Sequence, residues 1–215
     1  MSKPRVLISV PNGDGWMHKL DTFAVIRMLQ DSRVQSQFIA PTWSPYENNL
    51  HKIRIDFLSQ GFDYWINIDS DNPPQNNPID LVFLGLDIVG CVTPVWANMK
   101  PGDFPVYWNA LDAVGTDGWK PHTVCEGLQE VDAIGSGCMV LSKAVMAILP
   151  APFQRIYNSD GTVNIGCDYA FCRRAKKLGF KVYAHYGYPC HHFNEIDLCE
   201  VVKAFADYMK AHPHG

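Results

Sequence analysis

The first half of the chain alternates short apolar runs with stretches whose apolar residues recur at helical spacing. The apolar runs predict buried strands over residues 6–10, 35–40, 64–68 and 87–92. Helices are predicted between them, around Leu20, Ala24 and Met28 and over residues 48–60 and 79–84. Strands and helices that alternate in this way favour βαβ units. The pattern therefore predicts an α/β fold with a mostly parallel central sheet flanked by helices.

The alternation stops between residues 97 and 125, which are rich in Gly, Pro, Trp and Asn. We expect an irregular excursion there that could cover a site. Strands are predicted again over residues 130–134, 138–141 and 181–185.

Two further helices are predicted near the end of the chain. One runs from Asp168 to Leu178, and its inward residues are expected to be Phe171, Ala175 and Leu178. The other is amphipathic, is capped by Asn194 and carries Leu198, Val202, Phe205 and Met209.

Composition agrees with one well-packed domain over residues 1–215. Apolar residues make up 47% of the 215 and charged residues 19%, which is enough for a filled core. The net charge of −4 gives no electrostatic footprint for nucleic acid. No apolar run is long enough to span a bilayer, and the N-terminus lacks a signal-peptide pattern. The seven cysteines lie scattered in apolar stretches, so we expect reduced thiols in a cytoplasmic protein.

Asp69 and Asp71 are the sharpest candidates for chemistry. They directly follow the predicted strand 64–68, and ligands of open α/β sheets bind beyond the carboxyl ends of strands. Two carboxylates one residue apart can hold a hard cation such as Mg²⁺ or Mn²⁺. The alternative is that both residues only shape the turn before Pro73 and Pro74.

A pair of histidines follows the last predicted strand. In a parallel sheet the loop that carries His191 and His192 can return to the edge that carries Asp71, so one imidazole could be a further metal ligand. The alternative is a surface histidine pair. A zinc site built from Cys167, Cys172, Cys190 and a histidine is disfavoured, because these residues form no Cys-x-x-Cys pair.

Three other features have both a structural and a functional interpretation. Asp168 starts a predicted helix and can cap it, or act as a general base. The stretch Gly135–Gly137 lets the backbone approach a ligand closely, or simply bends between strands. Lys52 and Arg54 could reach phosphate oxygens, or lie on a solvated helix face.

Other phosphate and hydrolase motifs do not fit. His18 stands where a dinucleotide fingerprint that starts at Gly13 needs its third glycine. The chain contains no Gly-Lys-Ser/Thr phosphate loop and no Gly-x-Ser-x-Gly elbow.

Taken in order, four segments resemble the GT-A-fold glycosyltransferases, especially the family 2-like group. Residues 62–71 are similar to the strand and metal-binding DxD motif, and 131–141 to the stretch beside the donor sugar and acceptor. Residues 166–175 are similar to the acidic helix start, and 189–193 to the late histidine motif. Cys167 departs from the pattern, since the family often has Glu there.

The resemblance implies a single-domain, Rossmann-like GT-A fold and a role for each motif. A Mn²⁺ or Mg²⁺ ion would join the donor diphosphate to Asp69, Asp71 and His192, and Asp168 would be the base if the reaction inverts the sugar. The donor would also contact Ser70 and lie over Val10, Pro11, Asn12 and Gly13, with its sugar toward Gly135, Ser136 and Gly137.

The expected function is therefore transfer of a sugar from a nucleotide-sugar, a UDP-sugar by expectation, to an acceptor hydroxyl. The acceptor stays open: a glycan, a protein, a small molecule or a modified DNA base. Two alternatives remain, a Mg²⁺-dependent nucleotidyltransferase or phosphatase and a non-catalytic nucleotide-sugar-binding module.

Overall fold

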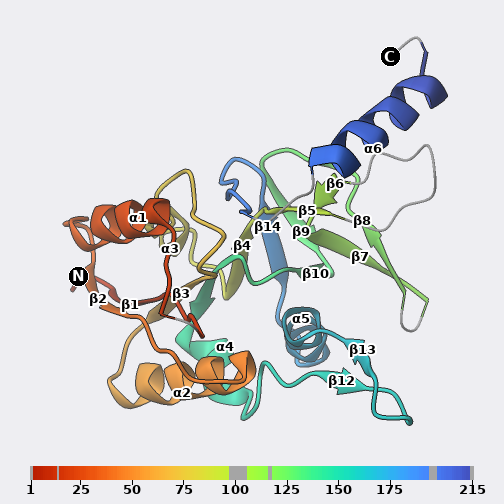
Figure 1. The fold of residues 1–215 in the computed structure, drawn as a ribbon. Helices are drawn as coiled ribbons and strands as arrows, with labels where there is room; N and C mark the ends of the chain where they lie inside the picture. The colour runs from red at the N-terminus through yellow and green to blue at the C-terminus, as the bar shows by residue number, and fades with distance from the viewer. Residues whose placement is uncertain (1, 14, 97–105, 116–117, 194–197, 214–215) are drawn as a thin grey trace.

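A seven-stranded sheet forms the centre of the protein (Figure 1). The computed structural model describes residues 2–13, 15–96, 106–115, 118–193 and 198–213. The strand order is β2-β1-β3-β11-β4-β14-β9. In chain order the strands are β1 (Arg5–Ser9), β2 (Gln35–Ile39), β3 (Tyr64–Ile68), β4 (Ile88–Cys91), β9 (Leu128–Val131), β11 (Cys138–Ser142) and β14 (Val182–His185). Strands β9 and β11 run against the rest, so the sheet is mostly parallel, as the sequence predicts.

Helices cover both faces of this sheet (Figure 1). One face carries α1 (Lys19–Leu29) and α3 (Ile79–Val82). The other face carries α2 (Tyr46–Ser59), α4 (Lys143–Ile148) and α5 (Cys167–Lys177). The last helix, α6 (Leu198–Ala211), extends away from the sheet. None of the helices in the described ranges is both long enough and apolar enough to cross a bilayer.

Each face of the sheet has its own apolar core. Successive side chains of a strand point to opposite faces, so Trp65 packs with α2 and Phe171 while its neighbour Ile66 packs with Met28 of α1. The two cores hold the largest fully buried side chains of the described chain, among them Trp65 and Phe171. The sheet edge between these cores is therefore rigid, which suits a site that needs fixed side chains.

Regular structure exists where the sequence predicts an irregular excursion. The short strands β5 (Pro94–Trp96) and β6 (Val106–Trp108) pair with each other, and β7 (Ala110–Val114) pairs with β8 (Gly118–Pro121) and β10 (Ala133–Ile134). Residues 97–105 and 116–117 lie outside the described ranges. The prediction was wrong for the described part, because the apolar stretches of these strands are very short or interrupted by polar residues, Gly and Pro. A further short hairpin joins β12 (Ile156–Tyr157) to β13 (Val163–Ile165).

The predicted strand 130–134 is broken at Asp132. The backbone N–H of Asp132 donates to Leu111, and its carboxylate accepts from the N–H of Ala113 at 2.8 Å and pairs with Lys176. These bonds move the chain from the main sheet, where β9 ends, to the small sheet that contains β10. An apolar run read alone does not reveal such a change of sheet.

Both C-terminal helices exist, but parts of their predicted packing are wrong. Leu178 ends α5 and is largely exposed, whereas Phe171 and Ala175 are buried as predicted. In α6 the apolar side chains Val202, Phe205 and Met209 of the predicted amphipathic helix are exposed. The spacing of apolar residues shows that a helix has an apolar stripe. It does not show whether another part of the fold covers that stripe. The predicted cap Asn194 lies outside the described residues.

Replacement of Phe171 by Ala should lower the free energy of unfolding by about 3–5 kcal/mol, since Phe171 is fully buried and the change leaves a cavity. Leu178→Ala, at the exposed end of the same helix, should change it by less than about 0.5 kcal/mol. Urea denaturation of both variants checks this. Equal losses would contradict the packing described for α5.

Candidate active site

The carboxyl ends of the parallel strands meet at one edge of the sheet, and the acidic motifs gather there. Asp69 follows β3, and Val10 follows the neighbouring parallel strand β1. A chain of buried hydrogen bonds leads to Asp69. The Ser9 hydroxyl donates to Asn67 at 2.9 Å, and the Asn67 amide donates to the Asp69 carboxylate at 3.3 Å. The two strand ends are thus fixed relative to each other.

Two hydroxyl groups hold the Asp69 carboxylate. Tyr46, at the start of α2, donates to Oδ1, and Ser136 donates to Oδ2 at 2.9 Å. The backbone N–H of Asp69 also donates to Gly137 at 2.9 Å. Burial, with a smaller contribution from the charge of Asp71, raises the pKa of Asp69 to about 6. Each carboxylate oxygen has two lone pairs; Oδ1 already accepts from Tyr46 and Asn67, so Oδ2 is the oxygen that can accept a further partner.

Asp71 and His192 lie together, as the sequence predicts. The Nε2 atom of His192 is 3.5 Å from Oδ2 of Asp71. The Nδ1–H of the same ring donates to the Pro94 carbonyl at 2.7 Å, which leaves Nε2 directed toward Asp71. The side chain of Asp71 is 48% exposed and that of His192 is 24% exposed, so this pair is open to solvent and to a ligand.

Backbone pairing between two distant segments creates this contact. The N–H of Phe193 donates to Asp71 at 2.9 Å, and the N–H of His191 donates to Pro73 at 3.0 Å. Pro74 and Cys190 form an isolated antiparallel bridge. The DxD loop and the late histidine segment are therefore joined like two short strands. His191, by contrast, packs its ring on Phe193.

Asp168 approaches the same edge from the first turn of α5. The helix begins at Cys167 with Gly166 as its N-cap, so the predicted capping role of Asp168 is wrong. Its Oδ1 atom accepts the N–H of Tyr169 at 2.8 Å. Burial raises the pKa of Asp168, and the charge of Asp168 in turn raises the pKa of Asp69. Asp168 therefore lies near enough to Asp69 for its charge to act on that carboxylate.

The stretch Gly135–Gly137 needs its glycines for close packing. A Cβ atom on Gly137 would lie 2.6 Å from side-chain oxygens of Asn72 and Thr93. A Cβ on Gly135 would lie 2.7 Å from the Asn109 amide. These glycines let the chain pass beside the DxD loop and deliver Ser136 to Asp69.

Some of the residues predicted for donor binding lie at the acidic edge, and others do not. The segment Val10–Gly13 follows β1 and lies beside this edge. Ser70 is held there too, because its carbonyl accepts the N–H of His18 at the start of α1.

Lys52 and Arg54 have other partners. The Lys52 ammonium lies 4.2 Å from the Trp43 ring centroid, and Arg54 Nε donates to the Met146 carbonyl at 2.8 Å. Arg54 thereby ties α2 to α4.

Sequence reasoning missed Tyr46 and Asp21. Asp21 lies in the first turn of α1 and is fully buried, and within the described chain neither of its carboxylate oxygens has a hydrogen-bond partner. Burial, with smaller contributions from Asp71, Cys190 and Asp69, raises the pKa of Asp21 to about 8. A signal existed: Asp21 lies on the helical face of Ala24 and Met28, where an acidic residue is unexpected.

The raised pKa of Asp21 predicts a pH effect on folding. The pKa of this carboxyl group is near 4 in the unfolded chain and about 8 in the folded protein. Its contribution to the free energy of unfolding is fully present below pH 4 and is lost as the pH rises through about 8. Without added metal, Asp21→Asn should therefore flatten the decline in unfolding free energy between pH 4 and 8. At pH 9 the variant should gain on the order of a few kcal/mol over the wild type. Urea denaturation across this range measures the effect, and identical slopes would contradict it.

Comparison with known proteins shows the fold alone. No family model and no curated protein matches the sequence. A197 from STIV has a TM-score of 0.56 at 15% identity, over 89% of this chain and 86% of that one, and it shares the fold.

Two similar solved structures are transferases. A CMP:2-keto-3-deoxy-manno-octonic acid synthetase with CTP scores 0.47 at 12% identity, over 95% of this chain and 98% of that one. A glycosyltransferase involved in glycosylation of the major capsid of PBCV-1 scores 0.34 at 10%, over 67% and 63%. Their scores are too low to carry an argument about this chain.

Proposed function

We propose that this protein is a metal-dependent glycosyltransferase that moves a sugar from a nucleotide-sugar, a UDP-sugar by preference, to an acceptor hydroxyl. The observation that carries the proposal is the Asp71–His192 pair. The imidazole presents Nε2 toward the carboxylate while Nδ1–H is held by a backbone carbonyl. Histidines that bind metals are usually oriented by such a bond from the other ring nitrogen.

The donor set fits a divalent cation that also binds phosphate. Asp71 supplies carboxylate oxygen, His192 supplies nitrogen, and Asp69, two residues before Asp71, keeps one lone pair of Oδ2 free of protein donors. The partial exposure of Asp71 leaves room for phosphate oxygens and water. Bound there, Mn²⁺ or Mg²⁺ would offset the negative charge of the departing nucleoside diphosphate.

The strand ends beside this pair are proposed to hold the nucleotide. Asn12 is buried at the end of β1, and its side-chain oxygen has no partner among the described residues. An amide placed this way suits hydrogen bonding to a base or ribose. Ser70 adds a hydroxyl next to the metal ligands. The sugar would then lie toward Ser136, which also contacts Asp69.

Asp168 is proposed to take the proton of the acceptor hydroxyl, if the reaction inverts the sugar. Burial raises its pKa toward the range in which a carboxylate works well as a base. The acceptor would enter beside Tyr169, whose ring packs 5.6 Å from Trp119. Such aromatic faces suit the apolar faces of a glycan. The class of acceptor stays open: a glycan, a protein, a small molecule or a modified DNA base.

Loss of either ligand of the pair should remove metal-dependent donor binding. With Mn²⁺ and a panel of nucleotide-sugars, the wild type should melt at a higher temperature when its donor is present. Asp71→Ala should show no such shift and no donor hydrolysis. His192→Ala should weaken Mn²⁺ binding at least about tenfold.

His191→Ala is the matched control for this experiment, because His191 is the sequence neighbour that packs on Phe193. It should keep the donor shift and hydrolysis at nearly wild-type levels. Unchanged turnover in Asp71→Ala, or an equal loss in both histidine variants, would remove the metal proposal.

Asp168→Asn should keep donor binding and reduce transfer by about 10²–10⁴-fold, which is the usual contribution of a general base. The amide keeps the size of the side chain but takes up no proton. Asp160→Asn, in the exposed turn between β12 and β13, is the control and should leave transfer unchanged. Single-turnover transfer with the donor identified by the melting screen measures the effect. Near-normal transfer in Asp168→Asn would refute the base.

Nucleotidyl transfer is the second candidate, and Asp21 is the observation that favours it. This chemistry uses extra carboxylates near the metal, and Asp21 lies close enough to Asp69 and Asp71 for their charges to raise its pKa. The products separate the two reactions. Glycosyl transfer releases a nucleoside diphosphate from a nucleotide-sugar, whereas nucleotidyl transfer releases pyrophosphate from a nucleoside triphosphate.

A further inference from the structure

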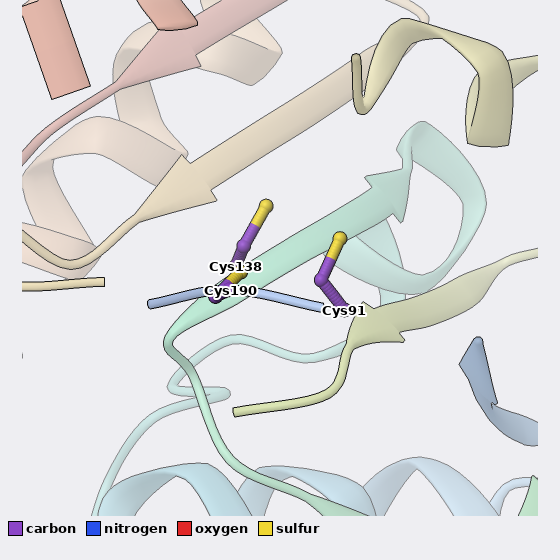
Figure 2. Close-up of side chains that lie close together, drawn as sticks. All are labelled: Cys91, Cys138 and Cys190. Atoms are coloured by element: carbon purple, nitrogen blue, oxygen red, sulfur yellow. The ribbon is translucent and has the colours of Figure 1, made fainter. Parts of the chain in front are cut away.

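Three cysteines that are far apart in the sequence meet inside the protein (Figure 2). They are Cys91 at the end of β4, Cys138 at the start of β11 and Cys190 in the segment after β14. Their sulfur atoms all lie within 4.8 Å of one another, and all three residues are buried. Figure 2 shows the side chains of Cys91 and Cys138 projecting side by side from neighbouring strands.

The fold itself sets this arrangement. The pairing of Met139 with Gly90 places Cys138 opposite Cys91 on antiparallel strands, so both side chains leave the same face of the sheet. The backbone N–H of Cys190 donates to the Val92 carbonyl at 2.8 Å, and Cys190 also bridges Pro74. Each thiol is thus attached to a strand or to a hydrogen-bonded segment.

We propose that Cys91, Cys138 and Cys190 bind a thiophilic metal ion, Zn²⁺, as three thiolate ligands. Zinc binds sulfur at about 2.3 Å, which corresponds to about 3.8 Å between the sulfurs of a tetrahedral site. The observed cluster needs only a small contraction to reach this spacing. Sulfur ligands select soft ions and disfavour Mg²⁺ and Mn²⁺, so this site is chemically separate from the carboxylate edge.

Unpaired polar groups surround the thiols in an otherwise apolar core. Asp21 is fully buried, and its carboxylate oxygens have no partner in the described ranges. Asp21 lies on α1, the helix that packs over the same apolar core as the three cysteines. The buried hydroxyl of Thr93, two residues after Cys91, also lacks a partner there. A buried carboxylate without a partner is costly, and a cation beside it removes that cost.

A metal ion here would join three parts of the fold. Cys91 and Cys138 belong to the central sheet, and Cys190 precedes the histidine pair. The ion would therefore fix the C-terminal segment to the sheet and stabilise the folded state, because the unfolded chain holds no such site. This inference does not depend on the proposed transferase activity.

Cobalt binding to the full chain tests the proposal. The protein is reduced, stripped of metal with a chelator and titrated with Co²⁺, whose thiolate complexes give an intense near-ultraviolet charge-transfer band. One equivalent of Co²⁺ should produce this band, one equivalent of Zn²⁺ should abolish it, and excess Mn²⁺ should leave it unchanged. One equivalent of Zn²⁺ should also raise the melting temperature.

Cys138→Ala should lose the band, and Cys172→Ala is the matched control. Cys172 is also buried, but it belongs to α5 and packs in the core on the opposite face of the sheet. Circular dichroism shows whether Cys138→Ala folds. If it does not fold, native mass spectrometry of the zinc-loaded wild type tests the proposal instead, and one bound zinc ion is expected. A wild type without the band or the bound zinc, or a band that survives in folded Cys138→Ala, would overturn the proposal.

Discussion

The backbone pairing of residues 71–74 with 190–193 is the interaction on which the candidate site depends. Two hydrogen bonds and one antiparallel bridge join a loop that follows β3 to a segment that follows β14. These strands are separated in the sheet by β11 and β4. The pairing brings Asp71 to His192 on its solvent side and Cys190 to Cys91 and Cys138 on its core side. One local contact therefore builds both proposed metal sites.

The acidic side chains of Asp21, Asp69 and Asp71 gather at this edge of the sheet. Asp69 is stabilised by the hydroxyls of Tyr46 and Ser136, whereas Asp21 has no partner among the described residues. Each carboxylate raises the pKa of a neighbour, and burial strengthens these effects. A site in which several carboxylates lie this close together favours the binding of cations. A bound cation would offset the cost of burying acidic residues so close to the core.

Most of the central sheet and its helices follow from the sequence, because their apolar runs are long enough to show a period. The segments that were mispredicted are the ones where that signal is short or ambiguous. The apolar stretches of β6 to β8 are very short or interrupted by polar residues, and the break at Asp132 depends on bonds to Leu111 and Ala113 of another strand. The exposed stripe of α6 has the expected pattern but no covering surface in the described chain.

The sequence by itself determined the parallel α/β framework and the acidic pair at the end of the central strand, since both depend on local pattern and on the general rule that ligands bind at strand ends. It also pointed to His192 and Asp168. Only the tertiary structure decided that Tyr46 and Ser136 hold Asp69, that Arg54 is tied to Met146, and that Cys190 joins Cys91 and Cys138 rather than Cys167 and Cys172. These contacts join residues that are distant in sequence, and their partners are set by sheet order and strand register, which local periodicity does not contain.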